Sequence, residues 1–247
     1  MSTVLFSEVE DFCYDVRPLN LSYAQATTSV HKGGGKYVYV DDKKKIDFTR
    51  LDYLALGNSS EVRDIMHDCI KKYDIACPAS QIIQRTDAIE NLEKELASLH
   101  GLKNAITFLS GYSANMNIIS LLGARRSTPH FRLYAKKLKW SKAIATQKTV
   151  FFIDSESHYS IILAAKQVKS LVGDKCLSFT YAGNDHEDLR RKIEAFEKKN
   201  DGTALKVIVS DSVSSTTGRI FDVERLCKIA KEYDAILYLD EKIHTPL

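Results

Sequence analysis

The chain has 247 residues, enough for a sizeable hydrophobic core in one large domain or in one domain with a small appendage. Apolar residues make up 44% and charged residues 27%, as in an ordinary globular protein, and the net charge of +3 is too small to indicate nucleic-acid binding. No apolar run is long enough to span a membrane, and residues 1–15 lack the apolar core of a secretion signal. The five cysteines have no paired spacing, so we expect reduced thiols, no metal site and a cytoplasmic location.

The first third of the chain predicts only short elements. Residues 1–30 give no firm prediction, and the glycines within 31–35 predict a flexible break. Residues 37–40 and 46–48, separated by a polar turn, predict a small β-hairpin. The small polar residues that end at Ser60 are typical of a helix start, and they predict a helix over 61–73.

A second helix is predicted from the spacing of apolar residues after the loop at 77–80. One face carries four aliphatic side chains, which are Ile89, Leu92, Leu96 and Leu99. Charged side chains, Glu93 among them, fall on the other face, as in an amphipathic helix. Gly101 is the expected stop at the C-terminal end of this helix.

The next segment has the order of a phosphate-binding turn. Residues 105–109 are apolar and predict a buried strand, Ser110 and Gly111 interrupt it, and 112–122 predicts a helix. A strand, a small-residue turn and a helix start together present free backbone N–H groups to an anion. The same pattern also occurs at an ordinary crossover from strand to helix, so it needs support from other segments.

Residues 124–148 are strongly basic and contain the only tryptophan, Trp140. A basic segment with aromatic residues can bind RNA or an acidic partner, but it is more typical of a solvated surface insertion. We therefore predict no nucleic-acid partner for this chain.

From residue 149 onwards strands and helices alternate regularly. Strands are predicted over 149–153, 176–181, 205–209 and 235–239, and helices over 160–168, 185–199 and 223–233. This alternation predicts an α/β fold with a mostly parallel sheet and helices on both faces. Ligands of such sheets bind at the carboxyl ends of the strands.

Polar groups follow three of these strand ends. Asp154 and His158 follow the first strand, residues 211–218 the third, and Asp240 and His244 the fourth. A carboxylate, a flat imidazole and a phosphate-binding turn at one edge suit an aromatic phosphorylated cofactor, because the carboxylate can hold a pyridine nitrogen protonated. Taken one by one, the aspartates also fit helix caps, and the histidines fit ordinary surface or core residues.

Six motifs follow one another along the chain. They are Asp52-Tyr53-Leu54-Ala55-Leu56, Leu92-Glu93-Lys94-Glu95-Leu96-Ala97, Ser110-Gly111-Tyr112-Ser113-Ala114-Asn115, Asp154 with His158-Tyr159-Ser160, Asp211-Ser212-Val213-Ser214-Ser215-Thr216-Thr217-Gly218, and Asp240-Glu241-Lys242-Ile243-His244. This ordered set resembles the α-oxoamine synthase family of pyridoxal-phosphate (PLP) enzymes, which have the aspartate-aminotransferase type of fold. The resemblance covers residues 37–247. Within the family, the stretches 80–93 and 211–218 look closest to the acyltransferases that make α-hydroxyketone quorum-sensing signals.

The resemblance implies a role for each matching residue. Ser110, Gly111 and Tyr112 would form the phosphate site, where the backbone N–H groups of Gly111 and Tyr112 bind the cofactor phosphate. His158 would stack on the pyridine ring, and Asp240 would pair with the pyridine nitrogen. These two residues, together with His244, are the expected catalytic residues.

Three further implications of the resemblance concern residues that depart from the family pattern. His244 and Ser215 would contact the ring hydroxyl, but the motif around His244 is one residue longer than in the family. Asp52 stands where the family usually has asparagine, near the substrate. The sequence stops at Leu247, before the position of the family's Schiff-base lysine, and Lys242 occupies a place where the family has a small residue. We therefore expect a C-terminally truncated chain that is inactive by itself.

The function implied by the resemblance is a transferase that condenses an acyl thioester, acyl-CoA, with an amino acid or a derivative. Residues 1–51 would form an N-terminal arm with the hairpin, and residues 52–247 the N-terminal part of an incomplete PLP-binding large domain. The expected assembly is a homodimer or a pair with a related subunit. Two alternatives stay open: a lysine-less, non-catalytic partner subunit, as in sphingolipid-synthesising relatives, and a PLP-dependent aminotransferase.

Overall fold

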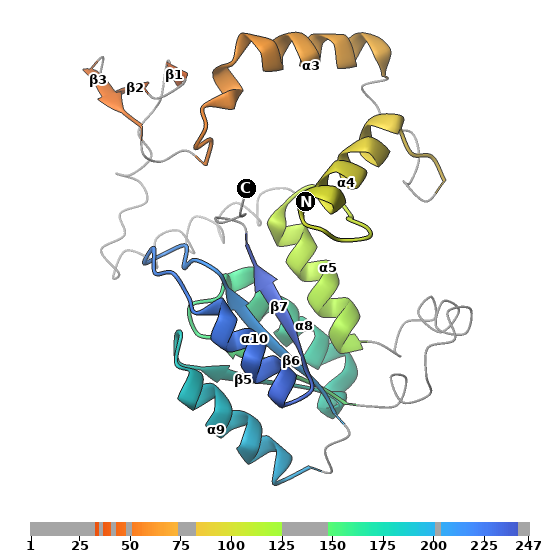
Figure 1. The fold of residues 1–247 in the computed structure, drawn as a ribbon, viewed down its shortest axis with the longest axis vertical. Helices are drawn as coiled ribbons and strands as arrows, with labels where there is room; N and C mark the ends of the chain where they lie inside the picture. The colour runs from red at the N-terminus through yellow and green to blue at the C-terminus, as the bar shows by residue number, and fades with distance from the viewer. Residues whose placement is uncertain are drawn as a thin grey trace, which may run out of the picture. The chain divides into compact units, whose positions relative to one another are not determined.

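The computed structural model describes residues 33–34, 37–40, 43–47, 51–73, 83–124, 148–200 and 204–241. Contacts within the chain divide it into two units, Met1–Arg85 and Thr86–Leu247 (Figure 1). The domain boundary that the sequence predicts between residues 51 and 52 stays a prediction. The basic segment 125–147 lies outside the described residues.

The first unit contains a small antiparallel sheet of β1 (Gly33–Gly34), β2 (Tyr37–Val40) and β3 (Lys43–Ile46). Val40 pairs with Lys43, so two residues separate the hairpin strands, as in the commonest hairpins. The predicted hairpin is thus confirmed, but its second strand covers Lys43–Ile46 rather than 46–48, because Lys43 and Lys44 belong to the strand and not to the turn. The prediction of a flexible break was wrong for Gly33 and Gly34, because both pair with β2.

A short 3-10 helix, η2 (Leu56–Asn58), precedes α3 (Ser60–Lys72) in the same unit. The Ser59 hydroxyl accepts a hydrogen bond from the Val62 amide at 3.5 Å, which caps the helix start. An acidic residue in the first turn and two lysines in the last complement the helix dipole. The helix predicted over 61–73 is confirmed.

A four-stranded parallel sheet lies at the centre of the second unit (Figure 1). Its strands, in spatial order, are β5 (Cys176–Tyr181), β4 (Thr149–Asp154), β6 (Leu205–Asp211) and β7 (Ala235–Asp240). Neighbouring strands pair in parallel, and the last residues of β6 and β7, Asp211 and Asp240, are partners in the register.

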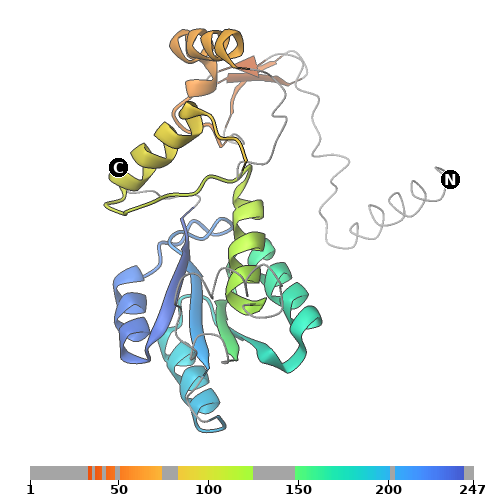
Figure 2. The same ribbon diagram turned by 90° about the vertical axis from the view of Figure 1, so that its right-hand side faces the viewer.

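Helices cover both faces of this sheet, as Figure 2 shows. On one face lie α5 (Gly111–Ala124) and α8 (Tyr159–Val172), and on the other α9 (His186–Glu197) and α10 (Val223–Glu232). The chain leaves β4 towards α8 on one face and leaves β6 towards α10 on the opposite face. Because β4 and β6 are neighbours, a topological switch point lies between their carboxyl ends, where sheets of this kind bind ligands.

The side chains of the central strands alternate between two buried clusters. Phe151 and Val207 belong to the cluster beneath α5 and α8, whereas Phe152 and Ile208 belong to the cluster beneath α9 and α10. This period of two is the expected geometry of a strand buried on both faces. The predicted α/β fold, a parallel sheet with helices on both faces, is confirmed.

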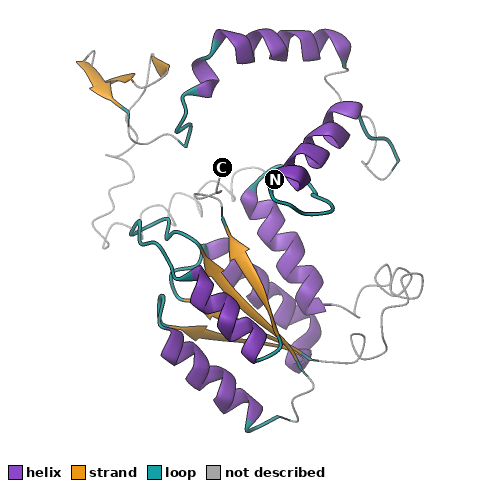
Figure 3. Cartoon of the chain, in the orientation of Figure 1, coloured by secondary structure: helices purple, strands orange, loops and turns teal. Residues whose placement is uncertain are grey.

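The strand predicted over 105–109 was wrong. These residues form part of a loop between α4 (Asp87–Leu99) and α5, drawn teal in Figure 3. Ile106 is 72% exposed and Leu109 fully exposed, so the apolar run has no neighbouring strand among the described residues. An apolar run forms a strand only with a partner strand beside it, and no described strand pairs with residues 105–109.

The burial of α4 also differs from its sequence pattern. Leu92 and Leu99 are about half exposed, at 50% and 54%, whereas Glu93 is buried. The Glu93 carboxylate accepts hydrogen bonds from the amide of Thr107 at 2.9 Å and from its hydroxyl at 3.0 Å. These two bonds satisfy a buried charge and fasten the loop to the helix. Among the helices that the structure describes, none has the length and apolar character to cross a membrane.

Candidate functional site

Asp240, the last residue of β7, lies beside α5. The side-chain amide of Asn115 donates to Asp240 Oδ2 at 2.8 Å and to Ser160 Oγ at 2.9 Å. The Tyr238 hydroxyl donates to Asn115 Oδ1 at 2.6 Å. Because Asn115 is buried and both ends of its amide are hydrogen-bonded, it fixes the position of the Asp240 carboxylate.

His158 joins the same network through Ser160. His158 is the N-cap of α8, and its Nδ1 accepts a hydrogen bond from the Ser160 amide at 3.3 Å. The Ser160 hydroxyl lies 2.7 Å from the same ring nitrogen. A chain of hydrogen bonds therefore runs from Asp240 through Asn115 and Ser160 to His158, and the structure brings these two predicted site residues together.

The predicted phosphate site is the start of α5. Ser110 Oγ accepts a hydrogen bond from the Ser113 amide at 3.1 Å, which caps the helix, while Ser110, Gly111 and Tyr112 are exposed. A helix start of this kind offers backbone N–H groups and the positive end of the helix dipole to an anion. Asn115 is four residues further along, about 6 Å at the helical rise. The candidate anion site is thus one helical turn from the contact with Asp240.

The loop after β6 carries Ser215 in an exposed turn. Gly218 in this loop has a φ of +69°, a conformation that favours glycine. The loop is tied to the loop after β4, because the Thr217 hydroxyl donates to Glu156 Oε2 at 3.0 Å and Arg219 forms an ion pair with Glu156 at 3.2 Å. Hydrogen bonding from Ser214, then from Thr217, and the charge of Arg219 lower the pKa of Glu156.

Asp154, which the sequence placed at a strand end, has a structural role. It is fully buried, and it accepts hydrogen bonds from the amides of Glu156 at 2.8 Å and Asn184 at 2.9 Å. Burial raises its pKa, although both amides oppose this effect. Asp154 therefore holds together the loops that follow β4 and β5.

Two further predicted residues are not joined to this network by the structure. Asp52 belongs to the first unit, where its Oδ2 accepts a hydrogen bond from the Gly57 amide at 3.0 Å and its backbone carbonyl one from Ala55 at 3.0 Å. It shapes the turn that contains η2, and its contact with a substrate stays a prediction. His244 lies outside the described residues.

Sequence reasoning quoted Asn115 and Ser160 within motifs but gave neither a role, and it did not consider Tyr238. A signal for Asn115 was present, because its spacing from Ile119 and Gly123 places it on the buried stripe of α5. A polar residue on such a stripe needs hydrogen-bond partners. The other two partners could not be deduced without the register of the sheet.

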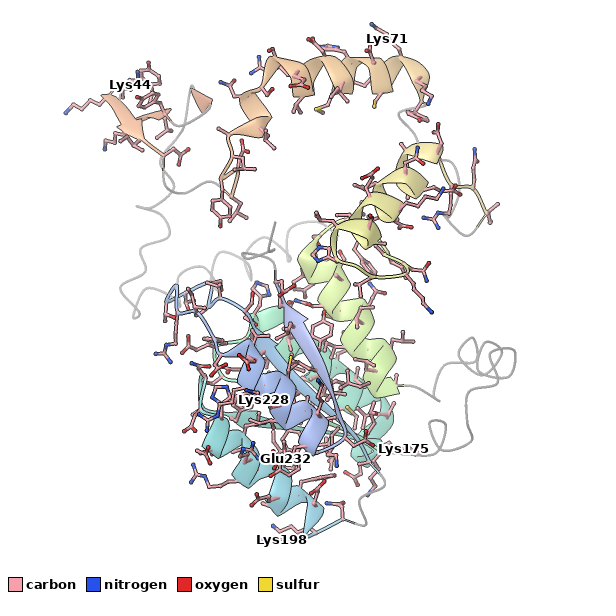
Figure 4. The ribbon with its side chains drawn as sticks, viewed as in Figure 1. Lys44, Lys71, Lys175, Lys198, Lys228 and Glu232 are labelled. Atoms are coloured by element: carbon pink, nitrogen blue, oxygen red, sulfur yellow. The ribbon has the colours of Figure 1, made fainter. Side chains whose placement is uncertain are left out.

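The loops after β4, β5 and β6 contain no lysine in the part of the chain that the structure describes. Figure 4 shows Lys175 and Lys198 at the opposite end of the sheet and Lys228 on the outer side of α10. Lys242 lies outside the described residues. Among all the residues that the structure describes, no group of three His, Cys, Asp or Glu side chains is arranged to hold a metal ion.

A comparison with protein families matches residues 43–244 to the model of the family described as aminotransferase class I and II. The chain belongs to the aminotransferase class I and II family. The parallel sheet and the carboxylate at the end of β7 are the parts of this family member that position the candidate site.

Curated relatives of this family member are α-oxoamine synthases. It is 31% identical over 191 residues to mitochondrial 5-aminolevulinate synthase of Saccharomyces cerevisiae, covering 77% of this chain and 29% of that protein. It is 28% identical to the serine palmitoyltransferase of Sphingobacterium spiritivorum, covering 83% of this chain and 43% of that protein. It is also 28% identical to the 8-amino-7-oxononanoate synthase of Lysinibacillus sphaericus, covering 85% and 46%. The chain thus spans less than half the length of these relatives.

Solved structures show the same fold. A serine palmitoyltransferase from S. paucimobilis, solved with a bound PLP–myriocin aldimine, superimposes with a TM-score of 0.73 at 18% identity, over 98% of this chain and 53% of that chain. The Sphingomonas wittichii serine palmitoyltransferase gives a TM-score of 0.72 at 19% identity, over 94% and 51%. At these identities the likeness establishes the fold of the large domain.

Proposed function

We propose that this chain carries a PLP site of the α-oxoamine synthase type and belongs to a transferase that condenses acyl-CoA with an amino acid or a derivative. The observation that carries this proposal is the hydrogen-bonded chain from Asp240 through Asn115 and Ser160 to His158, one helical turn from the start of α5. The relatives named as synthases and as a palmitoyltransferase support acyl transfer over amino transfer.

The residues present fit this cofactor. The start of α5 is exposed and suits a phosphate, and the Asn115 amide holds the Asp240 carboxyl group in place by donating to it. Bound PLP supplies a ring that withdraws electrons from the substrate α-carbon when its ring nitrogen is protonated. Asp240 would hold the proton on that nitrogen, and His158, oriented by Ser160, would cover one face of the ring.

The proposal gives roles to three further residues. Ser215 and His244 would contact the ring hydroxyl, and Asp52 would lie near the amino-acid substrate. A cytoplasmic homodimer, or a pair with a related subunit, is the assembly that we propose. Synthesis of an α-hydroxyketone signal is the finer function that the motifs at 80–93 and 211–218 favour.

A second candidate function is a non-catalytic subunit that pairs with an active relative. The described loops after β4, β5 and β6 contain no lysine, so neither candidate takes a Schiff-base lysine from them. Borohydride reduction of the purified chain in the presence of PLP, followed by mass spectrometry, separates the two. Stoichiometric labelling of one lysine would support a catalytic chain and contradict the non-catalytic subunit.

The PLP site itself is tested by equilibrium dialysis with Gly111→Asp and its neutral control Gly111→Asn. An aspartate in the first turn is compatible with the helix dipole, so folding should persist while the new charge repels phosphate. We expect Gly111→Asp to bind PLP at least tenfold more weakly than Gly111→Asn. Equal affinity of the two variants, with both folded, would argue against a phosphate at this helix start.

A further inference from the structure

Asp211 is a buried carboxyl group to which the proposed chemistry gives no role. It is the last residue of β6 and the register partner of Asp240 on β7. Val207 and Val209 face α5 and α8, and because side chains alternate along a strand, Asp211 lies on the same face. Tyr238 packs against the same cluster, so the same alternation places Asp240 on this face. The two carboxyl groups therefore stand side by side on neighbouring strands, which lie about 4.8 Å apart.

The surroundings of the two carboxyl groups differ. Asp240 is only partly buried, and its Oδ2 accepts the hydrogen bond from Asn115. Asp211 is only 4% exposed, and its Oδ1 has no hydrogen-bond partner in the part of the chain that the structure describes. Two adjacent carboxyl groups with little water cannot both ionise readily, so one of them keeps a proton. The deeper burial of Asp211 and its unpartnered Oδ1 assign that proton to Asp211.

We propose that Asp211 is a positioning residue that keeps its proton until near neutral pH, so that the Asp211–Asp240 pair carries one negative charge rather than two. Loss of the Asp211 proton would add a second negative charge beside Asp240, the residue proposed to hold the ring nitrogen. The coupling to the ring nitrogen rests on the proposed function, whereas the proton on Asp211 does not.

The charged and titratable groups around Asp211 come from every neighbouring strand. Burial and then the charge of Asp240 raise the pKa of Asp211 to about 7, and Asp154 at the end of β4 adds to this effect. The Ser157 hydroxyl and the backbone N–H of His158 oppose it. Tyr181 on β5 is buried and keeps its proton, because burial and Asp154 raise its pKa. The Asp211 proton is therefore exchanged near neutral pH.

The first experiment is an NMR titration of the chain labelled with 13C at the aspartate carboxyl carbons, without added cofactor. We expect one carboxyl with a midpoint near 7 that is absent from Asp211→Asn and retained in Asp222→Asn, which changes an exposed helix cap. If every aspartate titrates below about pH 5, or the resonance persists in Asp211→Asn, the proposal is overturned.

A second variant keeps this test informative if Asp211→Asn does not fold. Asp240→Asn removes the neighbouring negative charge and leaves the Asp211 carboxyl in place. We expect the midpoint of Asp211 to fall in this variant, since the charge of Asp240 is the second-largest cause of its raised pKa. An unchanged midpoint would show that the charge of Asp240 does not affect the protonation of Asp211, and it would overturn the proposal.

The coupling is measured with pyridoxine 5′-phosphate, which has the ring and the phosphate but no aldehyde to react with lysine. Its affinity is compared at pH 6 and pH 8 for the wild-type chain and for Asp211→Asn, so that titration of the probe itself cancels. We expect the ratio of affinities between the two pH values to differ at least threefold between wild type and variant. If the Asp211 midpoint is near neutral but the two affinity ratios are identical, the proton on Asp211 is supported and its coupling to the ring nitrogen is refuted. The proposed position of the ring nitrogen beside Asp240 is then refuted as well.

Discussion

Asn115 and Asp240 are 125 residues apart in sequence, yet the side-chain amide of one lies 2.8 Å from the carboxylate of the other. The contact joins α5 to the end of β7, and Asn115 also bonds Ser160 and Tyr238. One buried amide thus connects two helices with the sheet. Its position depends on packing that no local segment determines.

Asn115→Ala should lower the free energy of unfolding by about 1–3 kcal/mol, because it leaves several buried polar groups without partners. The matched control is Asn117→Ala on the same helix, whose exposed amide bonds only the Ser113 carbonyl and should cost at most about 0.5 kcal/mol. Urea denaturation followed by circular dichroism measures both values. Equal values for the two variants would contradict the structural role of Asn115.

Glu93→Ala should release the loop between α4 and α5. Glu93 provides the acceptor for both the amide and the hydroxyl of Thr107, so its removal leaves that amide open to solvent. Hydrogen–deuterium exchange at Thr107 should become at least tenfold faster. Glu95→Ala, an exposed position on the same helix, should leave this exchange rate unchanged.

Gly123→Ala should destabilise the packing between α5 and α8. A Cβ atom at this position would lie 2.7 Å from Val168 Cγ1, 3.1 Å from the Phe151 ring and 3.2 Å from the Cys176 sulfur. Such overpacking typically costs about 1–3 kcal/mol. In a Val168→Ala background the closest contact is absent, so the added cost of Gly123→Ala should shrink. An equal cost in both backgrounds would rule out Val168 as the obstacle.

The stability of the chain should carry a pH dependence that originates from Asp211. The pKa of this carboxyl is about 7 when folded and 3.8 in the reference state, so the unfolded chain loses the proton first as the pH rises. The free energy of unfolding then falls between these two values, by at most about 1.4 kcal/mol per pH unit. Asp211→Asn lacks this loss, and its stability relative to wild type should increase from pH 5 to pH 8 in urea denaturation. Asp222→Asn should show no such increase.

The regular part of the fold could be predicted from sequence because each element there has a local signal. The strand at 176–181 was predicted with both boundaries correct, and the helix at 223–233 ended one residue too late. Strands of apolar residues followed by amphipathic helices leave little choice of connection, since parallel crossovers are right-handed. The fold class follows from this alternation.

The parts that could not be predicted depend on contacts between distant segments. Residues 105–109 have the composition of a strand, but a strand also needs a neighbour, and the register of Asp211 with Asp240 appears only once β6 and β7 are paired. Glu93 looked like a solvent-exposed charge until Thr107 was placed beside it. His158 and Asp240 were found because each follows a strand end, whereas the asparagine between them was visible only as part of a motif.

The segments on either side of residues 125–147, the end of α5 and the start of β4, are in contact in the structure. The hydroxyl of Thr149, at the start of β4, donates to the backbone carbonyl of Leu122, near the end of α5, at 3.0 Å. The path from helix to strand can therefore be closed by a linker of a few residues. A shortened gene that replaces 125–147 with such a linker keeps every strand connection of the parallel sheet, and it offers a compact version of the second unit for crystallisation and spectroscopy.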